Sequence, residues 1–390
     1  MTVPQPVDPA ARIASIDALR GIALCGILLV NIFDMGGPIA MDRPLTVPTL
    51  GDADWQVWAI AQLFITGTMR GLFSMLFGLG LLIFVGDDPS ADRSRLYLRR
   101  LVLLLLFGIV DSTLLLWPGD ILVIYALAGT VVLILHRLTP AQLFAAAGAI
   151  LMLISAWAAY EARGISPLAT IYSPAMLAHE GAARLGGYWQ TFDYMRYVSW
   201  NWTMNALTFR WVGDAAAFML IGMGLYREGL FGPAVDRRLP VRLASFGYGL
   251  GLILRLIHVV LVWSHDGGPT LLSALIDQPG RLAMTLGHVG LFLLLWRGGV
   301  APRMMGSFAT MGRMALTLYL GQSLIAALIF SGFGLGLWNR LSWPQLWLVA
   351  PAILAIEALF ATLWFKAFRY GPVEWIWRWS TYRQRPVLLR

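Results

Sequence analysis

The stretch RIASIDALRGIALCGILLVN, residues 12–31, is apolar enough for a membrane-spanning helix, yet it contains Asp17, Arg20 and Asn31. On an α-helix Arg20 and Asn31 fall on nearly one line, with Asp17 about 60° and Asp34 about 40° to the side. A polar stripe is too costly to face lipid, so it indicates a helix whose polar face looks into a bundle. The simpler alternative is an Asp17–Arg20 pair that fixes the helix end at the membrane surface.

The composition of the whole chain is that of a membrane protein. Of its 390 residues 58% are hydrophobic and 13% charged, and the mean hydropathy is +0.69. Soluble domains have about 45–50% apolar and about 25% charged residues. The apolar runs recur in blocks close to the roughly 20 residues that cross a bilayer, and they do not alternate. Because lipid satisfies no backbone polar group, the runs predict an all-α polytopic transmembrane helix bundle.

We expect about ten spans, with about eight or eleven as alternatives, in a single integral membrane domain covering residues 1–390. Five spans fall within residues 1–160, an external aromatic loop follows at 161–199, and residues 200–390 hold five more spans and a cytoplasmic tail. The predicted spans are 20–33, 57–85, 101–117, 120–136, 141–160, 201–226, 243–263, 280–296, 305–331 and 345–366.

The distribution of arginine predicts the orientation, because basic residues remain on the cytoplasmic side of a membrane. Arginines concentrate before the first predicted span, in the even-numbered connections and in the tail, whereas the opposite loops hold most of the Asp and Glu residues. We therefore expect both termini in the cytoplasm. Topology and contact with anionic membrane lipids explain the net charge of +8, so we expect no nucleic-acid partner.

Metal and disulfide chemistry have little support in the sequence. Cys25 is the only cysteine, which excludes an internal disulfide and a cysteine metal site. The five histidines form no H-x-x-H or H-E-x-x-H pattern, so we expect no metal.

Ionisable side chains also recur inside the later predicted spans. They are Arg70, Asp111, Arg210, Asp214, Arg255, His258, Arg281, His288 and Glu357. Together they predict one polar chamber inside the bundle, with ion pairs that only hold helices together as the alternative. The motif M-L-x-G-x-G-L occurs at 75–81 and again at 219–225, which indicates a parallel internal repeat.

Four passages, the last in two parts, resemble one known family. They are RIASIDALRGIALCGILLVN at 12–31, FSMLFGLG at 73–80, LLLFGIVDSTLLLWPGDILVIYALAG at 104–129, and the pair MGRMALTLYLGQS at 311–323 and YGPVEWIWRWSTY at 370–382. On these passages the chain resembles the YeiB-like bacterial integral membrane proteins, known as domain of unknown function 418. The resemblance implies a multi-pass protein of the bacterial cytoplasmic (inner) membrane.

The first passage is similar, more loosely, to the N-terminal helix of two groups of transmembrane acyltransferases, the heparan-α-glucosaminide N-acetyltransferase type and the acyltransferase-three type. All share an Asp-x-x-Arg-Gly start, here Asp17 to Gly21. The similarity implies transfer of an acyl group, such as acetyl, from cytoplasmic acyl-CoA to an extracytoplasmic acceptor such as a glycan. Where these relatives have histidines, this chain has Asn31 or Asp42, and Asp111 replaces a histidine frequent in YeiB-like proteins.

Acyl transfer needs cations for the CoA phosphates, a hydrogen-bond donor for the developing oxyanion and a base near the acceptor. The predicted acyl-CoA site is Asp17, Arg20, Arg99 and Arg100, and the predicted catalytic residues are Asn31, Asp34, Asp111 and His258. Asn31 would contact the oxyanion, and one of the other three catalytic candidates would be the base.

Two other functions fit the same features. A transporter or flippase with a polar cavity near the membrane midplane is the main alternative, because many helices and an internal repeat suit alternating access. A non-catalytic scaffold is the third, expected if all buried charges are paired. A glycan or small-molecule acceptor and a homo-oligomeric state stay open. The stretch PVEWIWRWSTYR, residues 372–383, predicts a helix along the cytoplasmic surface with a Glu374–Arg378 pair.

Overall fold

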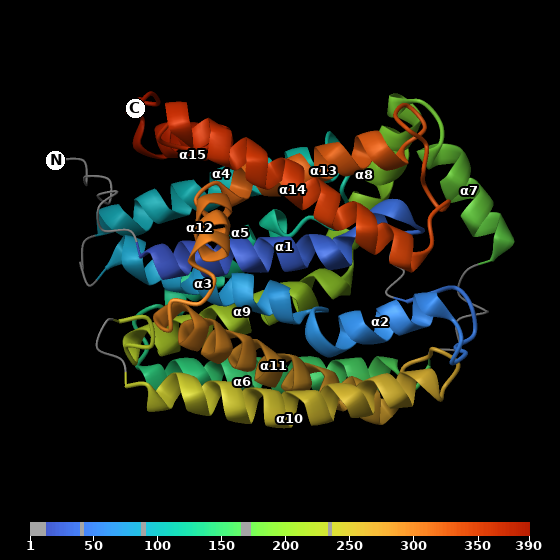
Figure 1. Cartoon of the computed structure of the whole chain (residues 1–390), viewed down its shortest axis with the longest axis horizontal. Helices are drawn as coiled ribbons and strands as arrows, with labels where there is room; N and C mark the ends of the chain where they lie inside the picture. The colour runs from blue at the N-terminus through green and yellow to red at the C-terminus, as the bar shows by residue number, and fades with distance from the viewer. Residues whose placement is uncertain (1–12, 40–42, 87–90, 165–172, 233–235) are drawn as a thin grey trace.

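The computed structural model describes residues 13–39, 43–86, 91–164, 173–232 and 236–390 (Figure 1). Within these ranges it contains fifteen helices and no strand, apart from an isolated bridge between Phe368 and Leu389. The helices are α1 (Ala14–Gly36), α2 (Ala53–Phe64), α3 (Thr68–Val85), α4 (Ala91–Thr113), α5 (Leu122–Leu135), α6 (Pro140–Glu161), α7 (Pro174–Arg184), α8 (Tyr188–Met204), α9 (Ala206–Arg227), α10 (Arg238–Trp263), α11 (Leu271–Arg297), α12 (Pro302–Gly312), α13 (Ala315–Phe330), α14 (Trp343–Ala367) and α15 (Pro372–Tyr382).

Most helices lie along one axis, so the bundle has two ends, named here the α15 end and the α7 end (Figure 1). At the α15 end Ile13, Gly86 and Arg227 line a common hollow, which places the ends of α3 and α9 beside the start of α1. At the α7 end the Asn339 amide donates to the Gly36 oxygen at 2.7 Å. The start of α1 and the C-terminal helix thus share one end. That this end is cytoplasmic stays a prediction.

In the described residues, five helical segments are long and apolar enough to cross a membrane, or up to seven if each sharply bent pair is one span. The five are 14–36, 53–85, 140–161, 238–263 and 343–367, and the bent pairs are α8–α9 and α12–α13. Each of the ten predicted blocks overlaps a helix. However, α5 has only 14 residues, and α11 contains Asp277, Arg281 and His288, which lower its hydropathy. The protein is an all-α membrane bundle, and the count of ten stays a prediction.

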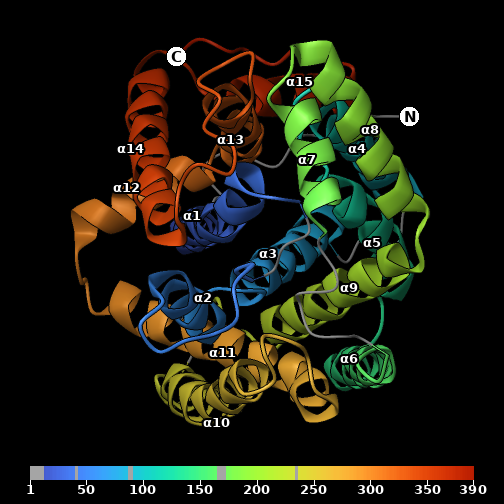
Figure 2. The same ribbon diagram turned by 90° about the vertical axis from the view of Figure 1, so that its right-hand side faces the viewer.

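Within the segment predicted as an external aromatic loop, 161–199, the structure has α7 and most of α8 (Figure 2), and the external position of the segment stays a prediction. The Ser173 side chain accepts a hydrogen bond from the Met176 amide, and Pro174 opens the first turn of α7. Phe192 of α8 packs on a small apolar cluster that includes Met195. The segment is therefore a helical cover at the α7 end, except for residues 165–172, which lie outside the described ranges.

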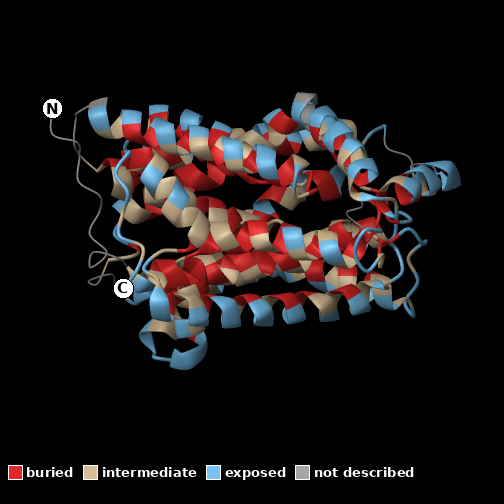
Figure 3. Cartoon of the chain, turned by 90° about the horizontal axis from the view of Figure 1, so that it is seen from above, coloured by how far each residue is buried: buried red, intermediate tan, exposed pale blue. Residues whose placement is uncertain are grey.

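Burial distinguishes inner from outer helices (Figure 3). In the most apolar window of α1 67% of the residues are buried, compared with 28% in α10 and in α14. Exposed side chains on these outer helices include Phe246 and Leu348. Helices α10 and α14 thus present apolar surface outward, as lipid contact requires.

The repeated motif lies once on α3 and once on α9, and the two copies pack against each other. A methyl group at Gly78 would lie 2.2 Å from the Met219 backbone oxygen, and one at Gly222 would lie 2.1 Å from the Met75 oxygen. The contact is reciprocal, and in both copies glycine allows the backbones to approach closely.

We predict that Gly222→Ala lowers the midpoint of thermal unfolding in detergent, because the added methyl group displaces the Met75 carbonyl. Overpacking of this kind costs about 1–3 kcal/mol, more than the roughly 1 kcal/mol that alanine gains in helix propensity. Gly80→Ala is the matched control, since a methyl group there meets no atom within 4 Å. A Gly222→Ala protein as stable as the parent would contradict the close approach of α3 and α9.

Candidate functional site

A cavity of about 270 Å³ lies near the α15 end of the bundle. Helices α1, α3, α4, α5 and α15 and the corner between α12 and α13 contribute to its wall. Its charged and tyrosine lining residues are Arg20, Tyr97, Arg100, Tyr125, Arg313, Tyr319, Tyr370, Glu374 and Arg378. Segments far apart in the sequence thus build one polar site.

Close backbone contact brings the α12–α13 corner to α1. A methyl group at Gly312 would lie 1.8 Å from the Asp17 backbone oxygen, and one at Gly21 would lie 2.0 Å from the Phe308 oxygen. Directly after this contact the chain bends by 83° between α12 and α13. The bend places Arg313 on the cavity wall with Arg20.

Three of the four lining arginines stack on aromatic rings. The Arg100 guanidinium lies 4.2 Å from the Trp377 ring centre and 4.7 Å from the Phe84 ring centre. Arg313 lies 4.0 Å from the Phe365 ring centre, and Arg378 lies over two tyrosine rings. Stacking holds a guanidinium in place through its face, so the stacking itself does not use the N–H groups, which point outward in the plane of the guanidinium. Arg100 Nε is buried and has no hydrogen-bond partner among the described residues.

Only two carboxylates accompany these arginines among the described lining residues and their ion-pair partners. Asp17 pairs with Arg20 at 2.9 Å. Glu374 caps the start of α13, because it accepts hydrogen bonds from the Leu316 amide at 2.8 Å and from the Thr317 amide at 3.1 Å. Burial raises the pKa of the Glu374 carboxyl, and these hydrogen bonds oppose the rise. The cavity therefore has an excess of positive charge.

The expected Glu374–Arg378 pair is wrong. Among the described residues Glu374 bonds to the α13 start, and Arg378 lies 5.1 Å from the Tyr370 ring centre. The helix itself was predicted correctly, as α15. Its glutamate side is buried against α13 rather than solvated, so an ion pair across the surface does not form.

Tyr125, Ile121 and Tyr319 also line the cavity, and all three are buried; they are called the floor here. The Ile121 amide donates to the Tyr319 oxygen at 3.1 Å, and the Tyr319 hydroxyl interacts with the Asp120 carboxylate. Asp120 Oδ2 also accepts from the Val123 amide at 2.8 Å, which caps α5. A hydroxyl with a carboxylate behind it is a proton-transfer arrangement.

Asp111 lies behind this floor, next to Asp120. The two carboxyl groups interact electrostatically, and Asp111 is fully buried. The polar side chains nearest the Asp111 carboxyl are those of Asp120 and Ser323. Two buried carboxyl groups beside a cavity are more typical of function than of packing.

The predicted acyl-CoA residues lie together at the α15 end, with one difference. Arg20 and Arg100 line the cavity, and Asp17 holds Arg20. Arg99 points elsewhere, because its Nη1 donates to the Thr381 oxygen at 2.9 Å. Arg99 thus fixes α15 to α4 instead of facing the cavity.

The other predicted catalytic residues are not brought to this cavity. Asn31 and Asp34 lie farther along α1 toward the α7 end, and Asp34 is about 21 Å from Arg20 along the helix axis. There Arg184 donates a hydrogen bond to the Asp34 backbone oxygen at 3.2 Å. His258 belongs to α10, and its side chain faces α11, where Nδ1 lies 3.0 Å from the Ser273 backbone oxygen. Of the four predicted catalytic residues, only Asp111 adjoins the cavity.

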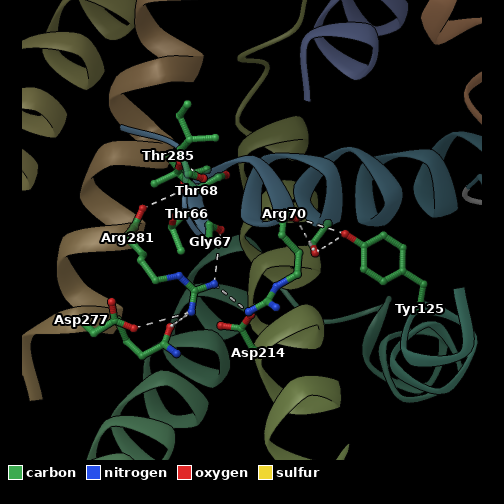
Figure 4. A network of polar contacts seen from close by, with 12 residues as sticks. Thr66, Gly67, Thr68, Arg70, Tyr125, Asp214, Asp277, Arg281 and Thr285 are labelled. Atoms are coloured by element: carbon green, nitrogen blue, oxygen red, sulfur yellow. Dashed lines mark hydrogen bonds and ion pairs between the residues drawn. The ribbon is translucent and has the colours of Figure 1, made fainter. Parts of the chain in front are cut away.

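A second polar cluster lies where α2 breaks into α3 (Figure 4). Asp214 Oδ2 accepts from Arg70 Nη2 and from Arg281 Nη2, each at 3.1 Å. Arg281 also lies 4.0 Å from Asp277, which accepts from Arg255 at 2.6 Å. The predicted single chamber is thus divided into a cavity at the α15 end and this ion-pair cluster.

The broken helix supplies acceptors to the cluster. Arg255 donates to the backbone oxygens of Gln62 and Thr66, at 2.6 and 3.1 Å. Arg281 Nη2 donates to the Gly67 oxygen at 3.3 Å, and Gly67 has a φ of 73°, which favours glycine. Helix-end carbonyls and arginines therefore satisfy each other inside the bundle.

The sequence did not identify Arg313, Arg378, Tyr125 or Tyr319 as site residues. A signal was present, since every lining residue except Tyr97, Arg100 and Leu101 lies in the passages 12–31, 73–80, 104–129, 311–323 and 370–382. These passages carry the resemblance to the YeiB-like family. Their meeting around one cavity is what the sequence alone does not reveal.

Among the residues that the structure describes, no group of three His, Cys, Asp or Glu side chains is placed to hold a metal ion.

Comparison with known proteins gives consistent matches. Residues 225–384 match the model of a protein family described as a protein of unknown function, DUF418. The chain is similar to the uncharacterized protein YeiB of Escherichia coli (strain K12), with 31% identity over 95% of this chain and 97% of that protein. It is 28% identical to the uncharacterized protein YxaH of Bacillus subtilis (strain 168), over 97% of this chain and 96% of that protein.

We predict that Asp214→Asn strongly destabilises the protein, because it leaves Arg70 and Arg281 without their shared charge partner. Breaking a buried ion pair costs about 3–5 kcal/mol. Asp193→Asn is the control, since Asp193 is 72% exposed and lies 3.9 Å from Arg196; it should change stability by less than about 0.5 kcal/mol. Thermal unfolding in detergent measures both, and equal effects would contradict the role of Asp214.

Proposed function

Since this chain belongs to the YeiB-like family DUF418, we propose a reaction for it from the geometry of its arginine-lined cavity. The reaction is acyl transfer, in which acyl-CoA binds in the cavity and its acyl group, for example acetyl, passes to an acceptor. One observation carries the proposal: the same cavity is lined by stacked arginines and by Tyr319, whose hydroxyl interacts with the Asp120 carboxylate.

The arginines fit the donor. CoA carries a diphosphate, which guanidinium groups bind through paired N–H donors. Arg20, Arg100, Arg313 and Arg378 line the cavity, and the buried Nε of Arg100 has no hydrogen-bond partner among the described residues. The apolar lining, including Phe73, Leu76 and Phe77, suits the uncharged pantetheine arm and acyl group. A neutral substrate would gain nothing from this charge.

The floor fits the chemical step. An acceptor hydroxyl or amine attacks the thioester carbonyl and gives its proton to Tyr319, which passes its own proton to Asp120. The carbon–sulfur bond breaks, the sulfur takes up the proton, and the products are the acylated acceptor and free CoA. Asp111 would hold a proton jointly with Asp120 and so tune its basicity.

The proposal includes an orientation. Ten passes, with α1, α3, α4, α5, α6, α9, α10, α11, α13 and α14, would place the α15 end and both termini in the cytoplasm of a bacterium. The basic residues of that end would then face anionic lipids of the inner membrane. In this orientation the arginine-lined cavity lies on the side where acyl-CoA is available. A glycan or a small molecule would be the acceptor.

We predict that acetyl-CoA raises the midpoint of thermal unfolding of the protein in detergent, since a ligand of the native state stabilises it by about 2.7 kcal/mol at a hundred times its Kd. Arg20→Ala and Arg100→Ala should abolish the shift. Arg303→Ala is the control, because Arg303 is exposed at the start of α12, outside the cavity. A full shift in both cavity variants would falsify the assignment of the donor site.

We predict that Tyr319→Phe slows release of free CoA from acetyl-CoA, with water as the acceptor, by roughly 10²–10⁴-fold, the usual loss when a proton-transfer group is removed. The acetyl-CoA thermal shift should remain. Tyr97→Phe is the control, because Tyr97 lines the cavity beside Arg100, away from Asp120. Unchanged thiol release from Tyr319→Phe would exclude Tyr319 from the reaction.

A transporter or flippase is the second candidate, and the break between α2 and α3 favours it. Discontinuous helices with charged groups at the break form substrate sites in many transporters. Uptake of an anionic cargo into proteoliposomes, without any effect of acetyl-CoA on stability, would support this candidate over acyl transfer.

A further inference from the structure

The ion-pair cluster at the α2–α3 break contains more positive than negative charge. Arg70, Arg255 and Arg281 face only Asp214 and Asp277. His258 also lies near Asp277 and would add to the excess if protonated. A net positive charge inside a bundle is costly unless an anion or water compensates it.

The other charged groups near the cluster are already engaged. Arg210 pairs with Glu161 at 3.1 Å and adds no net charge. Asp34 lies near Arg184, which also pairs with Glu180 at 3.2 Å. Among the described residues, no further carboxylate therefore balances the cluster.

Arg70 is the member of the cluster that a ligand can reach. Its side chain is 37% exposed, compared with 6% for Arg281 and 0% for Arg255. Lipid does not account for this exposure, because α3 lies in the middle of the bundle and packs against α1, α4, α5, α9 and α11 (Figure 2). The exposed surface of Arg70 therefore faces space that water can enter beside the start of α3, not lipid.

Arg70 also has unused hydrogen-bond donors. Only Nη2 is engaged by a described residue, Asp214, and that carboxylate oxygen is shared with Arg281. Arg70 stands in the first turn of α3, where the helix dipole favours negative charge. Charge excess, access, free donors and dipole all favour the same kind of ligand.

We propose that Arg70 binds an anionic group, a carboxylate or a phosphate, of a ligand that reaches the exposed guanidinium at the start of α3. The site is distinct from the arginine-lined cavity, because Arg70 does not line that cavity. It does not depend on acyl transfer. If acyl transfer occurs, the anionic ligand is a candidate for the acceptor.

The test is thermal unfolding of the purified protein in detergent, titrated with sodium acetate, with sodium phosphate or with short-chain phosphatidic acid, against sodium chloride of equal ionic strength. We expect a saturating rise in the midpoint. A response to acetate or phosphate indicates a soluble ligand, and a response to phosphatidic acid alone indicates a lipid headgroup; either supports the site.

The variants locate the effect. Arg70→Gln should abolish the rise, which is measured relative to this variant's own midpoint without added anion, because the variant also loses the ion pair with Asp214. Arg70→Lys should keep a response with a half-saturating concentration at least fivefold higher, because lysine lacks the paired donors. Arg210→Gln is the matched control and should respond like the parent.

Two results overturn the proposal. One is the absence of any anion-specific rise in the parent protein, and the other is a full rise in Arg70→Gln. Arg100→Ala separates the two sites, because it should lose the response to acetyl-CoA and keep the response to these anions. Loss of both responses in Arg100→Ala counts against two independent sites.

Discussion

A single oxygen atom, Oδ2 of Asp214, joins α3, α9 and α11, because it accepts from Arg70 and Arg281 at the same 3.1 Å. Charges buried in a membrane protein must meet partners inside the bundle, so this contact fixes the central helices relative to one another. The Arg70 backbone oxygen in turn accepts from the Tyr125 hydroxyl at 3.1 Å. Through this contact the ion-pair cluster also fixes Tyr125 of α5, which forms part of the cavity wall.

The two polar regions use arginine in different ways. In the cluster at the α2–α3 break, guanidinium groups meet carboxylates and helix-end carbonyls, so most of their donors are occupied. In the cavity Arg100 lies over the rings of Phe84 and Trp377, and its Nε has no hydrogen-bond partner in the described part of the chain. Paired arginines stabilise a fold, whereas stacked arginines retain donors for a ligand. By this criterion Arg255 and Arg281 are structural, whereas Arg100, and Arg70 with only Nη2 engaged by a described residue, retain donors for a ligand.

Much of the fold was predictable because lipid imposes strong rules on composition and length. The apolar blocks, the surface helix at 372–383 and the polar face of α1 follow from such rules, and the structure has a helix at each. The helices at 174–184 and 188–204 were missed, since their polar and aromatic content resembles that of a loop. Arg20 and Arg100 were predicted together by charge and position, whereas Tyr319 and Arg378 reach the same cavity only through tertiary packing.

The 83° corner after Gly312 and the return of α15 to α4 have a consequence for biosynthesis. The cavity takes its wall from α1, near the start of the chain, and from α15, more than three hundred residues later. While the ribosome is still inserting the intervening helices, the nascent polypeptide has no closed pocket, and Arg100 lacks its second aromatic neighbour, Trp377. The pocket is therefore completed only after all the preceding helices have been inserted.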